Sequence, residues 1–379
     1  MPPATLAAVA PSRVAPRGSR ALTRGAARRA PSCRLSAVAP ASRLRSSPVS
    51  ASGPRPSSRR AHSLVAMAAP DDAGADEGAD AMSVMSVFSP SKVNLFLRIV
   101  RRRPDGFHDL ASLFHVIDLG DDMRFARSAS VTRDTLVCSD DTIPLDGRNL
   151  VIKALDLFRA KTGVNQYFWV ELEKKVPHGA GLGGGSGNAA TALWAANELC
   201  GRPATEEELL EWSGDIGSDI SVFFSKGAAY CTGRGEIVED VEPPLPLDTP
   251  MLLVKPDVGL STPQIFKALD LDGLSDEDPL KLLERIGREG CKDEICVNDL
   301  EAPAFGELPE LLELKERLRR EGEASGVASV FMSGSGSTIV QVGSDAVPEF
   351  VEKDEALFRA KTRLITREKG KWYEPSALR

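Results

Sequence analysis

One stretch of sequence decides the fold: Pro177-His178-Gly179-Ala180-Gly181-Leu182-Gly183-Gly184-Gly185-Ser186-Gly187-Asn188. It lies between a strand predicted at 167–174, where apolar and polar residues alternate, and a helix predicted at 188–200, which is rich in Ala and Leu. Glycine lets the backbone turn through positive φ, so successive N–H groups can converge on an anion at the positive end of the following helix. The stretch therefore predicts a phosphate-binding loop, in which the Ser186 hydroxyl suits a phosphate oxygen or a metal.

A flexible linker, a dinucleotide-binding loop and a P-loop agree less well with the residues around this stretch. A flexible linker need not lead directly into an Ala-rich helix. Residues 179–184 fit the GxGxxG pattern of dinucleotide-binding loops, but the next acidic residues, Glu198 and those at 206–208, fall in predicted helices instead of ending a second strand. The lysine of a GxxxxGK[ST] loop is absent, which excludes the P-loop NTPases. A dinucleotide-dependent oxidoreductase remains open only through the GxGxxG match.

The rest of the chain alternates between helix and strand patterns and contains no internal repeat. One helix is expected between Asn149, as its N-cap, and Gly163, as its left-handed terminator; Thr205 and Glu208 form a capping box for another. Further helices are expected at 262–269 and 311–322, and strands at 92–99, 113–118, 135–138, from 230 onward, 251–255, 327–332 and 337–342. This mixture predicts a protein of mixed α and β structure.

The segment 242–250 contains four prolines, which continue neither a helix nor a central strand. We therefore expect a domain boundary there. The expected organisation is an amino-terminal domain at 84–245, which contains the phosphate-binding loop, and a carboxy-terminal domain at 246–379. The tail after Lys369 has no pattern that predicts an element.

The beginning of the chain has a different composition from the rest. Before Asp71 there is no Asp, Glu or Lys, while twelve Arg lie among Ala, Ser and Pro between Arg13 and Arg60. This composition predicts a plastid or mitochondrial transit peptide at 1–70, followed by an acidic, solvated linker at 71–83. Without those twelve Arg, 35 of the 47 basic residues remain against 54 acidic ones, so residues 71–379 carry a formal charge of −19. A nucleic-acid partner is not expected.

The sequence also favours a protein without a membrane span and without disulfides. The longest uncharged run, at 324–344, is crowded with Ser and Gly and lacks continuous apolar surface. The cysteines show no CxxC pair and no histidine at zinc-finger spacing, so we expect free buried thiols. The close spacing of Cys291 and Cys296 leaves a redox or metal-binding role open for these two. The six are Cys33, Cys138, Cys200, Cys231, Cys291 and Cys296.

The phosphate-binding loop resembles the central Pro-x-x-x-Gly-Leu-Gly/Ser-Ser-Ser motif of a kinase superfamily that includes the galactokinases and the homoserine, mevalonate and phosphomevalonate kinases. The segment 89–95 (Ser-Pro-Ser-Lys-Val-Asn-Leu), followed by 103–108 (Arg-Pro-Asp-Gly-Phe-His), resembles the amino-terminal signature of one family within it, the 4-diphosphocytidyl-2-C-methyl-D-erythritol kinases. The segment 216–220 (Ile-Gly-Ser-Asp-Ile) is similar to that family's catalytic-aspartate segment, and 332–337 (Met-Ser-Gly-Ser-Gly-Ser) to the superfamily's third, Gly-rich motif. The resemblance covers residues 84–345.

This resemblance implies a fold and an activity. The fold would be α+β, with a ribosomal-protein-S5-like amino-terminal domain, a ferredoxin-like carboxy-terminal domain and the active site in the cleft between them. The activity would use ATP and Mg²⁺ to phosphorylate the 2-hydroxyl of a cytidine diphosphate ester of methylerythritol, a step of plastid and bacterial isoprenoid biosynthesis. A plastid stroma location agrees with the transit peptide predicted independently from composition. The expected partners are ATP and this small molecule, bound by a monomer or a weak homodimer.

The resemblance also implies roles for individual residues. Phosphoryl transfer leaves a protein mainly the tasks of positioning and of neutralising charge. Asp219 would accept the hydroxyl proton, and Lys92 would orient this aspartate and stabilise charge. The residues implied in ATP binding are Pro177, Gly179, Gly181, Leu182, Gly183, Gly184, Gly185, Ser186, Gly187 and Asn188. Those implied in substrate binding are Asn94 at the erythritol part, Phe107 and Phe266 on either side of the cytosine, His108 hydrogen-bonded to the base, and Thr262. The third motif contributes Gly334, Ser335 and Gly336, and no metal ligand is identified.

Three positions depart from the common form of the family. Phe107 stands where Tyr is frequent, which keeps a stacking face and removes a hydroxyl. Gly187 stands where a second Ser is usual, which removes a candidate phosphate or Mg²⁺ contact. Ser221 stands where Pro is common, which frees φ at the start of a helix. Two rival functions therefore stay open: a mevalonate-type kinase, which the Phe107-His108 pair argues against, and a nucleotide-binding protein that has lost catalysis.

Overall fold

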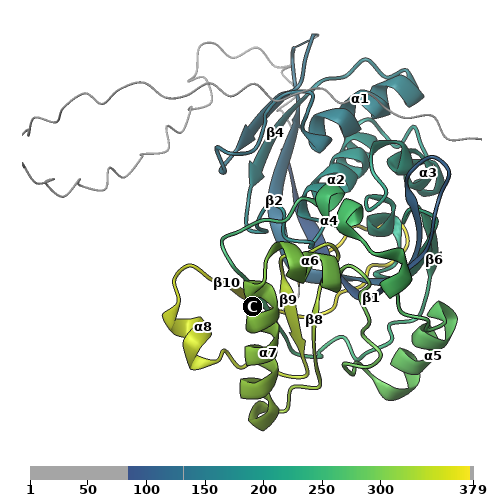
Figure 1. The fold of residues 1–379 in the computed structure, drawn as a ribbon. Helices are drawn as coiled ribbons and strands as arrows, with labels where there is room; N and C mark the ends of the chain where they lie inside the picture. The colour runs from purple at the N-terminus through teal and green to yellow at the C-terminus, as the bar shows by residue number, and fades with distance from the viewer. Residues whose placement is uncertain (1–83, 131, 376–379) are drawn as a thin grey trace, which may run out of the picture. The chain divides into compact units, whose positions relative to one another are not determined.

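The computed structural model describes residues 84–130 and 132–375 (Figure 1). The transit peptide predicted at 1–70, the linker predicted at 71–83 and Cys33 lie outside the described residues. The described residues form helices and two β-sheets, which confirms the predicted α+β class. The chain passes from the first sheet to the second between Asp240 and Met251, where the prolines are concentrated. The division into two domains at this point stays a prediction.

Two long antiparallel strands, β1 (Met85–Arg102) and β2 (His108–Arg127), form the centre of the first sheet. Both extend well beyond the predicted strands at 92–99 and 113–118. Their middle parts are buried on both faces. Phe114 and Val116 pack in one hydrophobic core, whereas the alternate residues Leu113 and Ile117 pack in another. The other strands of this sheet are β3 (Thr135–Cys138), β4 (Phe168–Glu173), β5 (Ala228–Thr232) and β6 (Ile237–Asp240), in the order β3-β4-β2-β5-β6.

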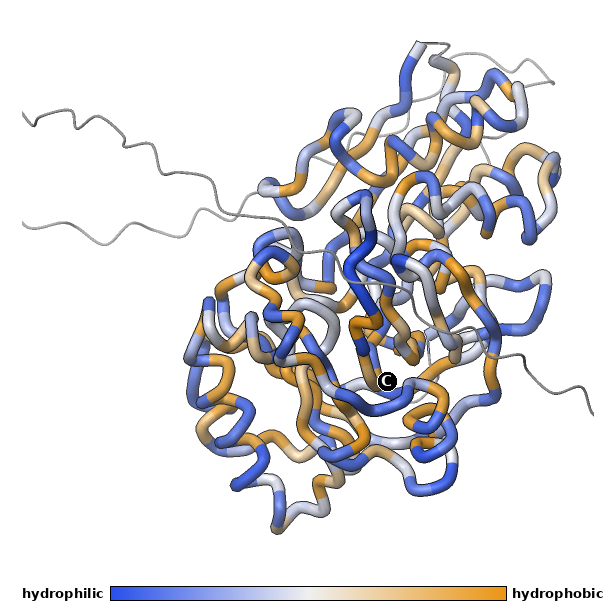
Figure 2. The backbone as a smooth tube through the Cα atoms, turned by 45° about the vertical axis from the view of Figure 1, so that its right-hand side comes forward, coloured by the Kyte–Doolittle hydropathy of each residue, from blue (hydrophilic) through white to orange (hydrophobic). Residues whose placement is uncertain are grey.

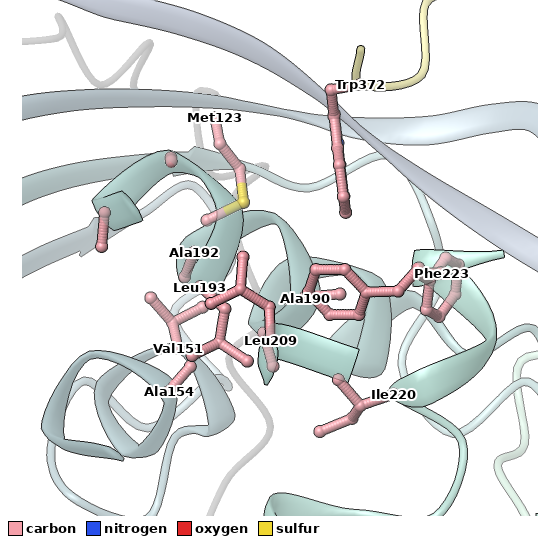
Figure 3. Packing of buried hydrophobic residues seen from close by; sticks show 14 of the residues in the cluster. Met123, Val151, Ala154, Ala190, Ala192, Leu193, Leu209, Ile220, Phe223 and Trp372 are labelled. Carbon is pink, nitrogen blue, oxygen red and sulfur yellow. The ribbon is translucent and has the colours of Figure 1, made fainter. Parts of the chain in front are cut away.

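Three helices belong to the first half of the chain: α1 (Leu150–Thr162), α2 (Gly184–Leu199) and α3 (Glu206–Ile216). Helix α2 packs on β1 and β2, and α1 and α3 pack on α2. Figure 3 shows side chains from these elements meeting in the first core, with Val151 of α1 and Leu193 of α2 close to Met123 of β2. The helix ends confirm the predicted signals: Asn149 caps α1, Gly163 ends it in the left-handed conformation, and the capping box starts α3.

The second sheet contains β7 (Met251–Lys255), β8 (Ser329–Met332), β9 (Ile339–Val342) and β10 (Phe358–Thr362), all antiparallel, in the order β10-β7-β9-β8. Helices separate β7 from β8, and α8 (Glu349–Lys353) separates β9 from β10. This is the β-α-β-β-α-β element order of a ferredoxin-like arrangement. The helices between β7 and β8 are α4 (Thr262–Ala268), α5 (Pro279–Glu289), α6 (Glu301–Glu307) and α7 (Glu310–Gly322).

After β10 the chain returns to the first half of the molecule. Ile365, Trp372 and Tyr373 are buried in the same core as α1 and α2, and Figure 3 shows Trp372 in this cluster. The Trp372 Nε1 donates a hydrogen bond to the carbonyl of Phe88 at 3.0 Å, and the Tyr373 hydroxyl donates one to the carbonyl of Ser225 at 2.7 Å. The tail, for which the sequence predicted no element, is therefore held by long-range packing instead of regular structure.

Hydrophobic residues are distributed in short runs over many elements (Figure 2). Across the residues that the structure describes, every helix is too short or too polar to cross a bilayer. The five cysteines of this part of the chain are free thiols, as predicted. Cys231, Cys291 and Cys296 are buried, but Cys138 and Cys200 are only half-buried, because they stand at the ends of β3 and α2, where the elements reach the surface.

Candidate active site

A cavity of about 540 Å³ lies beside the predicted phosphate-binding loop. Its walls come from β1, the loop and the start of α2, the segment between α3 and the short 3-10 helix Ser221–Phe224, the turn between β5 and β6, α4, and the loop between β8 and β9. Cavities of this size bind small molecules. The cavity therefore brings together residues of the loop and of the segments 89–95, 216–220 and 332–337, whereas the segment 103–108 lies outside its lining.

The phosphate-binding loop closes tightly around its neighbours. Gly181 and Gly183 have positive φ values of 74° and 67°. A Cβ on Gly181 would overlap the carbonyl oxygen of Ser333, and one on Gly183 would lie 2.9 Å from Cε of Lys92. Larger residues would thus push the loop away from β1 and from the third Gly-rich motif.

The first turn of α2 points its free N–H groups at the cavity. Its N-cap Gly183 offers no side-chain acceptor, and the N–H of Gly187 is the first to bond within the helix, to the carbonyl of Gly183 at 2.8 Å. Gly184, Gly185 and Ser186 line the cavity, and the first turn contains no acidic residue. Free N–H groups at the positive end of a helix suit an anion, and the residues present fit the phosphates of a nucleotide.

Lys92 is buried between the loop and the segment 216–220, which contains Asp219. Its Nζ lies 3.5 Å from Oδ2 of Asp219 and donates hydrogen bonds to Oδ1 of Asn94 at 2.7 Å and to the carbonyl of Gly181 at 3.1 Å. Burial lowers the pKa of Lys92, and the charge of Asp219 opposes this shift. Lys92 and Asp219 are therefore together, as the resemblance implied, and Asn94 is a direct partner of this pair.

Asp219 lies on a short segment that is fixed at both ends. Gly217 ends α3, and Ser221 begins the 3-10 helix that follows. The hydroxyl of Ser221 is buried and lies 2.8 Å from the hydroxyl of Ser213 on α3. The serine that replaces the common proline thus ties the two helices together beside Asp219, so the loosening that we expected from its free φ is offset.

The third Gly-rich motif is attached to the rest of the site. The Ser333 hydroxyl donates to the carbonyl of Gly181 at 3.1 Å and accepts from the N–H of Asn94 at 3.2 Å. Ser335 bonds the hydroxyl of Thr262 at 2.7 Å. Gly334 and Ser335 line the cavity, while Gly336 packs against Met332 and lies behind the lining.

The aromatic residues implied in cytosine binding make two separate contacts. The His108 ring lies 5.3 Å from the Phe266 ring, tilted by 31°, and Phe266 lines the cavity. Phe107 is 56% exposed, and the guanidinium of Arg234 lies over its ring, 5.5 Å from the centroid. Partial burial lowers the pKa of His108, and the charge of Arg102 adds to this effect. The structure thus brings His108 and Phe266 into contact, while the ring of Phe107 contacts Arg234.

Two residues of the central motif do not contact the cavity as a phosphate ligand would. Gly187 is buried outside the lining, and a Cβ there would overlap the carbonyl oxygen of Pro90. Asn188 reaches the lining, but its amide nitrogen donates to Ser89 at 2.9 Å and to Asp121 at 2.8 Å. Gly187 lets α2 pack closely on β1, and Asn188 attaches α2 to β1 and β2. Pro177, Gly179 and Leu182 line the cavity with the remaining members of the loop.

Sequence reasoning missed several residues of the site. Asn298 donates to the carbonyls of Met332 and Gly334, both at 2.8 Å, and so holds the third motif. Lys174 lines the cavity and forms an ion pair with the buried Asp121. No local pattern marks these residues, because each acts across the sheet. Arg234 lines the cavity from the β5–β6 turn. Its position between Gly233 and Gly235 is the sequence signal of a tight turn.

The site contains few ligands for a metal ion. Within 84–130 and 132–375, no three His, Cys, Asp or Glu side chains lie close enough together to hold one, which leaves the proposed metal-binding role of Cys291 and Cys296 without support there. The cavity does offer the Ser186 hydroxyl and the Asp219 carboxylate. Mg²⁺ prefers oxygen and is bound in kinases through one or two carboxylates and the substrate phosphates. The donors present fit a Mg²⁺ ion that the nucleotide itself carries.

Comparisons with known proteins agree with this geometry. The model of the GHMP kinases N terminal domain matches residues 149–227, which include the loop and Asp219. The 4-diphosphocytidyl-2-C-methyl-D-erythritol kinase, chloroplastic, of Arabidopsis thaliana is 56% identical over 78% of this chain and 78% of its own length. A crystal structure of 4-(cytidine 5'-diphospho)-2C-methyl-D-erythritol kinase is 30% identical, covers 74% of this chain and 99% of its own, and has a TM-score of 0.58. Homoserine kinase from Cytophaga hutchinsonii, 17% identical with a TM-score of 0.57 over 76% of this chain and 96% of its own, shares the fold.

The fold and the matched domain define a small-molecule kinase of the GHMP superfamily, which uses ATP. The GxGxxG match is therefore a coincidence of glycine spacing, and the oxidoreductase alternative is excluded. Within the superfamily, the chain belongs to the 4-diphosphocytidyl-2-C-methyl-D-erythritol kinase family. This confirms the family that the segments at 89–95 and 103–108 predicted.

Proposed function

We propose that the protein transfers the γ-phosphoryl group of ATP to the 2-hydroxyl of 4-diphosphocytidyl-2-C-methyl-D-erythritol. One observation carries this proposal: the buried Lys92 lies 3.5 Å from Asp219 in a cavity that also contains the first turn of α2 and the aromatic ring of Phe266. Transfer of a phosphoryl group from ATP to a cytidine diphosphate ester requires a charge pair, an anion site for the phosphates and a ring on which a base can stack.

ATP binds with its phosphates at the loop and at the N–H groups of Gly184, Gly185 and Ser186. Beyond the loop the cavity is lined by Ile143, Leu150 and Leu172, an apolar surface that suits the nucleotide base. Ser186 would be the donor from the loop to a Mg²⁺ ion that the ATP phosphates carry. When bound, the ion neutralises charge on the phosphates during transfer.

Asp219 accepts the proton of the acceptor hydroxyl. Its carboxylate is 38% exposed, on the cavity side, so a substrate hydroxyl can reach it. Lys92 stabilises the ionised carboxylate and the charge of the transferred group, while Asn94 and the carbonyl of Gly181 fix the position of its ammonium. General base catalysis of this kind contributes about 10²–10⁴-fold to the rate.

The cytidine end of the substrate lies at Phe266 and His108. Phe266 gives a stacking face, and the ring nitrogens of His108, 5.3 Å away centroid to centroid, give hydrogen-bonding groups for the base. Thr262, which is bonded to Ser335, lies at the same wall of the cavity. Asn94 contacts the methylerythritol part through its place beside Lys92.

The protein acts in the plastid, as the arginine-rich, acid-free sequence before Asp71 predicts and as the chloroplastic relative supports. Its partners are ATP and the cytidine diphosphate ester, and it works as a monomer or a weak homodimer.

The test is acceptor specificity. The purified protein is supplied with ATP, Mg²⁺ and either 4-diphosphocytidyl-2-C-methyl-D-erythritol or mevalonate, and ³¹P NMR identifies the phosphorylated position. We expect phosphorylation of the cytidyl substrate alone, at its 2-hydroxyl. Phosphorylation of mevalonate alone would favour a mevalonate-type kinase, and ATP binding without any product would favour a protein that has lost catalysis.

A further inference from the structure

Ser112 lies behind the active site, and nothing above assigns it a role. It stands on β2, opposite Leu97 of β1 and Cys231 of β5, and its side chain is fully buried. It is not part of the lining of the cavity, so any effect on the reaction must pass through a neighbour. A buried hydroxyl is costly unless it is hydrogen-bonded, and its partners therefore show what it does.

The Ser112 hydroxyl forms two hydrogen bonds whose directions are fixed. It donates to the carbonyl of Phe96 at 2.6 Å, and a carbonyl oxygen can only accept. The hydroxyl therefore accepts from its other partner, the Nδ2 of Asn94, at 2.8 Å. With Nδ2 bonded to Ser112, the Oδ1 of Asn94 accepts from the Nζ of Lys92 at 2.7 Å. This chain of three hydrogen bonds runs in one direction, from the ammonium to the backbone of β1.

A β-bulge in β1 shapes this chain. The pairing of β1 with β2 shifts between Asn94 and Phe96, so that Asn94 lies opposite Phe114 and Phe96 lies opposite Leu113. A bulge changes the direction of the side chains around it. Here the Asn94 amide and the Phe96 carbonyl both reach the hydroxyl of Ser112. The backbone of the strand therefore fixes the place at which Asn94 is held.

The ammonium of Lys92 depends on few groups. Its bond to Asn94 is the shortest of its contacts, because the carbonyl of Gly181 lies at 3.1 Å and Oδ2 of Asp219 at 3.5 Å. The titratable groups that act on it are Asp219 and the thiol of Cys231. Burial raises the pKa of Cys231, so this thiol stays neutral while the lysine titrates. The Asn94 amide is thus the closest acceptor for the charge of Lys92.

We infer that Ser112 is a positioning residue of the phosphoryl transfer: it holds the Asn94 amide with Oδ1 toward Lys92, and so keeps the ammonium charged and in place beside Asp219. The inference rests on the proposed function, in which Lys92 and Asp219 act on the acceptor hydroxyl. Without the Ser112 hydroxyl, the buried Nδ2 loses its acceptor, and the amide turns toward another one. Lys92 then loses a hydrogen bond to its charged form, which lowers its pKa further.

The test measures turnover and the charge of Lys92 separately. kcat with saturating ATP and cytidyl substrate is measured from about pH 7 to about pH 11 for the wild type, Ser112→Ala and Ser112→Thr. In the same proteins, ¹³C NMR of lysine labelled at Cε follows the ionisation of Lys92, and Lys92→Arg assigns its signal. We expect Ser112→Ala to lower kcat about 10-fold near pH 7, and to move the alkaline limb and the NMR midpoint to a pH lower by about one unit. Ser112→Thr keeps the hydroxyl and restores all three values.

Ser329→Ala is the matched control. Ser329 is as buried as Ser112, stands on a strand of the second sheet, donates to Asp293 at 3.0 Å and is not part of the cavity lining. This variant loses a buried hydroxyl and its hydrogen bond in the same way. We expect kcat, the alkaline limb and the NMR midpoint to stay at their wild-type values.

Several results would overturn the inference. Wild-type kcat and an unshifted limb in Ser112→Ala would do so, as would a loss of kcat without any shift of the limb and the midpoint, because that loss would be structural. An equal loss in Ser112→Thr would show that the hydroxyl is not what matters. If Ser112→Ala fails to fold, Ser112→Cys decides: a thiol bonds more weakly, so the limb and the midpoint move in the same direction by less, and unchanged values contradict the inference.

Failure of the proposed function gives a different result. A wild type that leaves the cytidyl substrate unphosphorylated overturns that function, and the NMR midpoint of Lys92 in Ser112→Ala still decides whether Ser112 maintains its charge. An active wild type with unchanged Ser112 variants overturns only the role of Ser112.

Discussion

The ammonium of Lys92 and the carboxylate of Asp219 lie 3.5 Å apart but in unlike surroundings: the Lys92 side chain is 2% exposed and that of Asp219 is 38% exposed. The lysine is locked by Asn94 and by the carbonyl of Gly181, so only the aspartate is open to a substrate. A buried cation beside an accessible carboxylate holds that carboxylate in place, so that it can reach the proton of a substrate hydroxyl.

The pH dependence of turnover follows from this pair. Burial lowers the pKa of Lys92 below the ordinary lysine value of 10.5, so the ammonium is lost at a lower pH than in an exposed lysine. If the charge of Lys92 is required, kcat falls on the alkaline side below pH 10.5. The measurement is kcat with saturating substrates from about pH 7 to about pH 11. Lys92→Arg keeps its charge over this range, so an unshifted alkaline limb in the residual activity of that variant would argue against Lys92 as the titrating group.

Gly187 tests the packing of α2 on β1. Because a Cβ at this position would overlap the carbonyl oxygen of Pro90, we expect Gly187→Ala to lower the free energy of unfolding by about 1–3 kcal/mol. Gly185→Ala is the matched control: its Cβ meets only Leu150, at 3.8 Å, and alanine favours the helix, so stability stays equal or rises. Urea unfolding of both variants gives the values. Equal stability of the two variants would show that α2 can move away from Pro90.

The tail gives a third test. Trp372 stacks on Trp194 with ring centroids 5.3 Å apart and contacts Phe224 edge-on, so Trp372→Ala removes a large part of the first core. We expect a loss of about 3–5 kcal/mol in the free energy of unfolding. Tyr373→Phe removes only the hydroxyl that donates to Ser225 and costs about 1 kcal/mol. If Trp372→Ala unfolds at the same denaturant concentration as the wild type, the tail does not pack as described.

His115 makes the fold sensitive to acid. Its ring is buried on β2 with Nε2 unpaired, and burial lowers its pKa to about 4 from the ordinary value of 6.5. The unfolded chain therefore takes up a proton below pH 6.5 that the folded chain takes up only near pH 4. Stability is fully present above pH 6.5 and falls as the pH drops through this window, by about 3 kcal/mol for this residue.

The check is the free energy of unfolding of wild type and His115→Leu at several pH values. Leucine is apolar, similar in size to histidine and does not titrate. The difference in the free energy of unfolding between the wild type and the variant should therefore change between pH 6.5 and pH 4. A constant difference across this window would show that His115 is not the group responsible.

Local chemistry in the sequence predicted much of this fold, and long-range contacts account for what it missed. Asn149, Gly163 and the Thr205–Glu208 capping box act within a few residues, so the ends of α1 and α3 were predictable. The start of α2 at Gly184 was not predictable, because a run of glycines has no helix preference and the N-cap, Gly183, has no capping side chain. The strand β10 and the tail depend on partners at β7 and in the first core, and nothing near them in the sequence specifies those partners.

The residues of the site also divide into those with a local sequence signal and those that depend on distant contacts. The loop, Lys92 and Asp219 were found from motifs, since each lies in a segment with a fixed pattern of residue types. Asn298 and Arg234 were not found from motifs. Asn298 matters because it bonds the carbonyl of Met332, 34 residues further along the chain, and Arg234 lies over the ring of Phe107, which is distant in the sequence. Gly187 was interpreted as a lost phosphate contact, and its close approach to Pro90 becomes visible only in three dimensions.

The central claim is that Asp219 is the base of an ATP-dependent transfer to 4-diphosphocytidyl-2-C-methyl-D-erythritol. The most direct test is turnover of this substrate by Asp219→Asn, together with ATP binding by the same protein. Asp215→Asn serves as the control, because Asp215 is an exposed residue at the end of α3 that pairs with Lys161. We predict that Asp219→Asn loses about 10²–10⁴-fold in kcat, with ATP affinity unchanged, while Asp215→Asn keeps wild-type turnover. Wild-type turnover by Asp219→Asn would contradict the account.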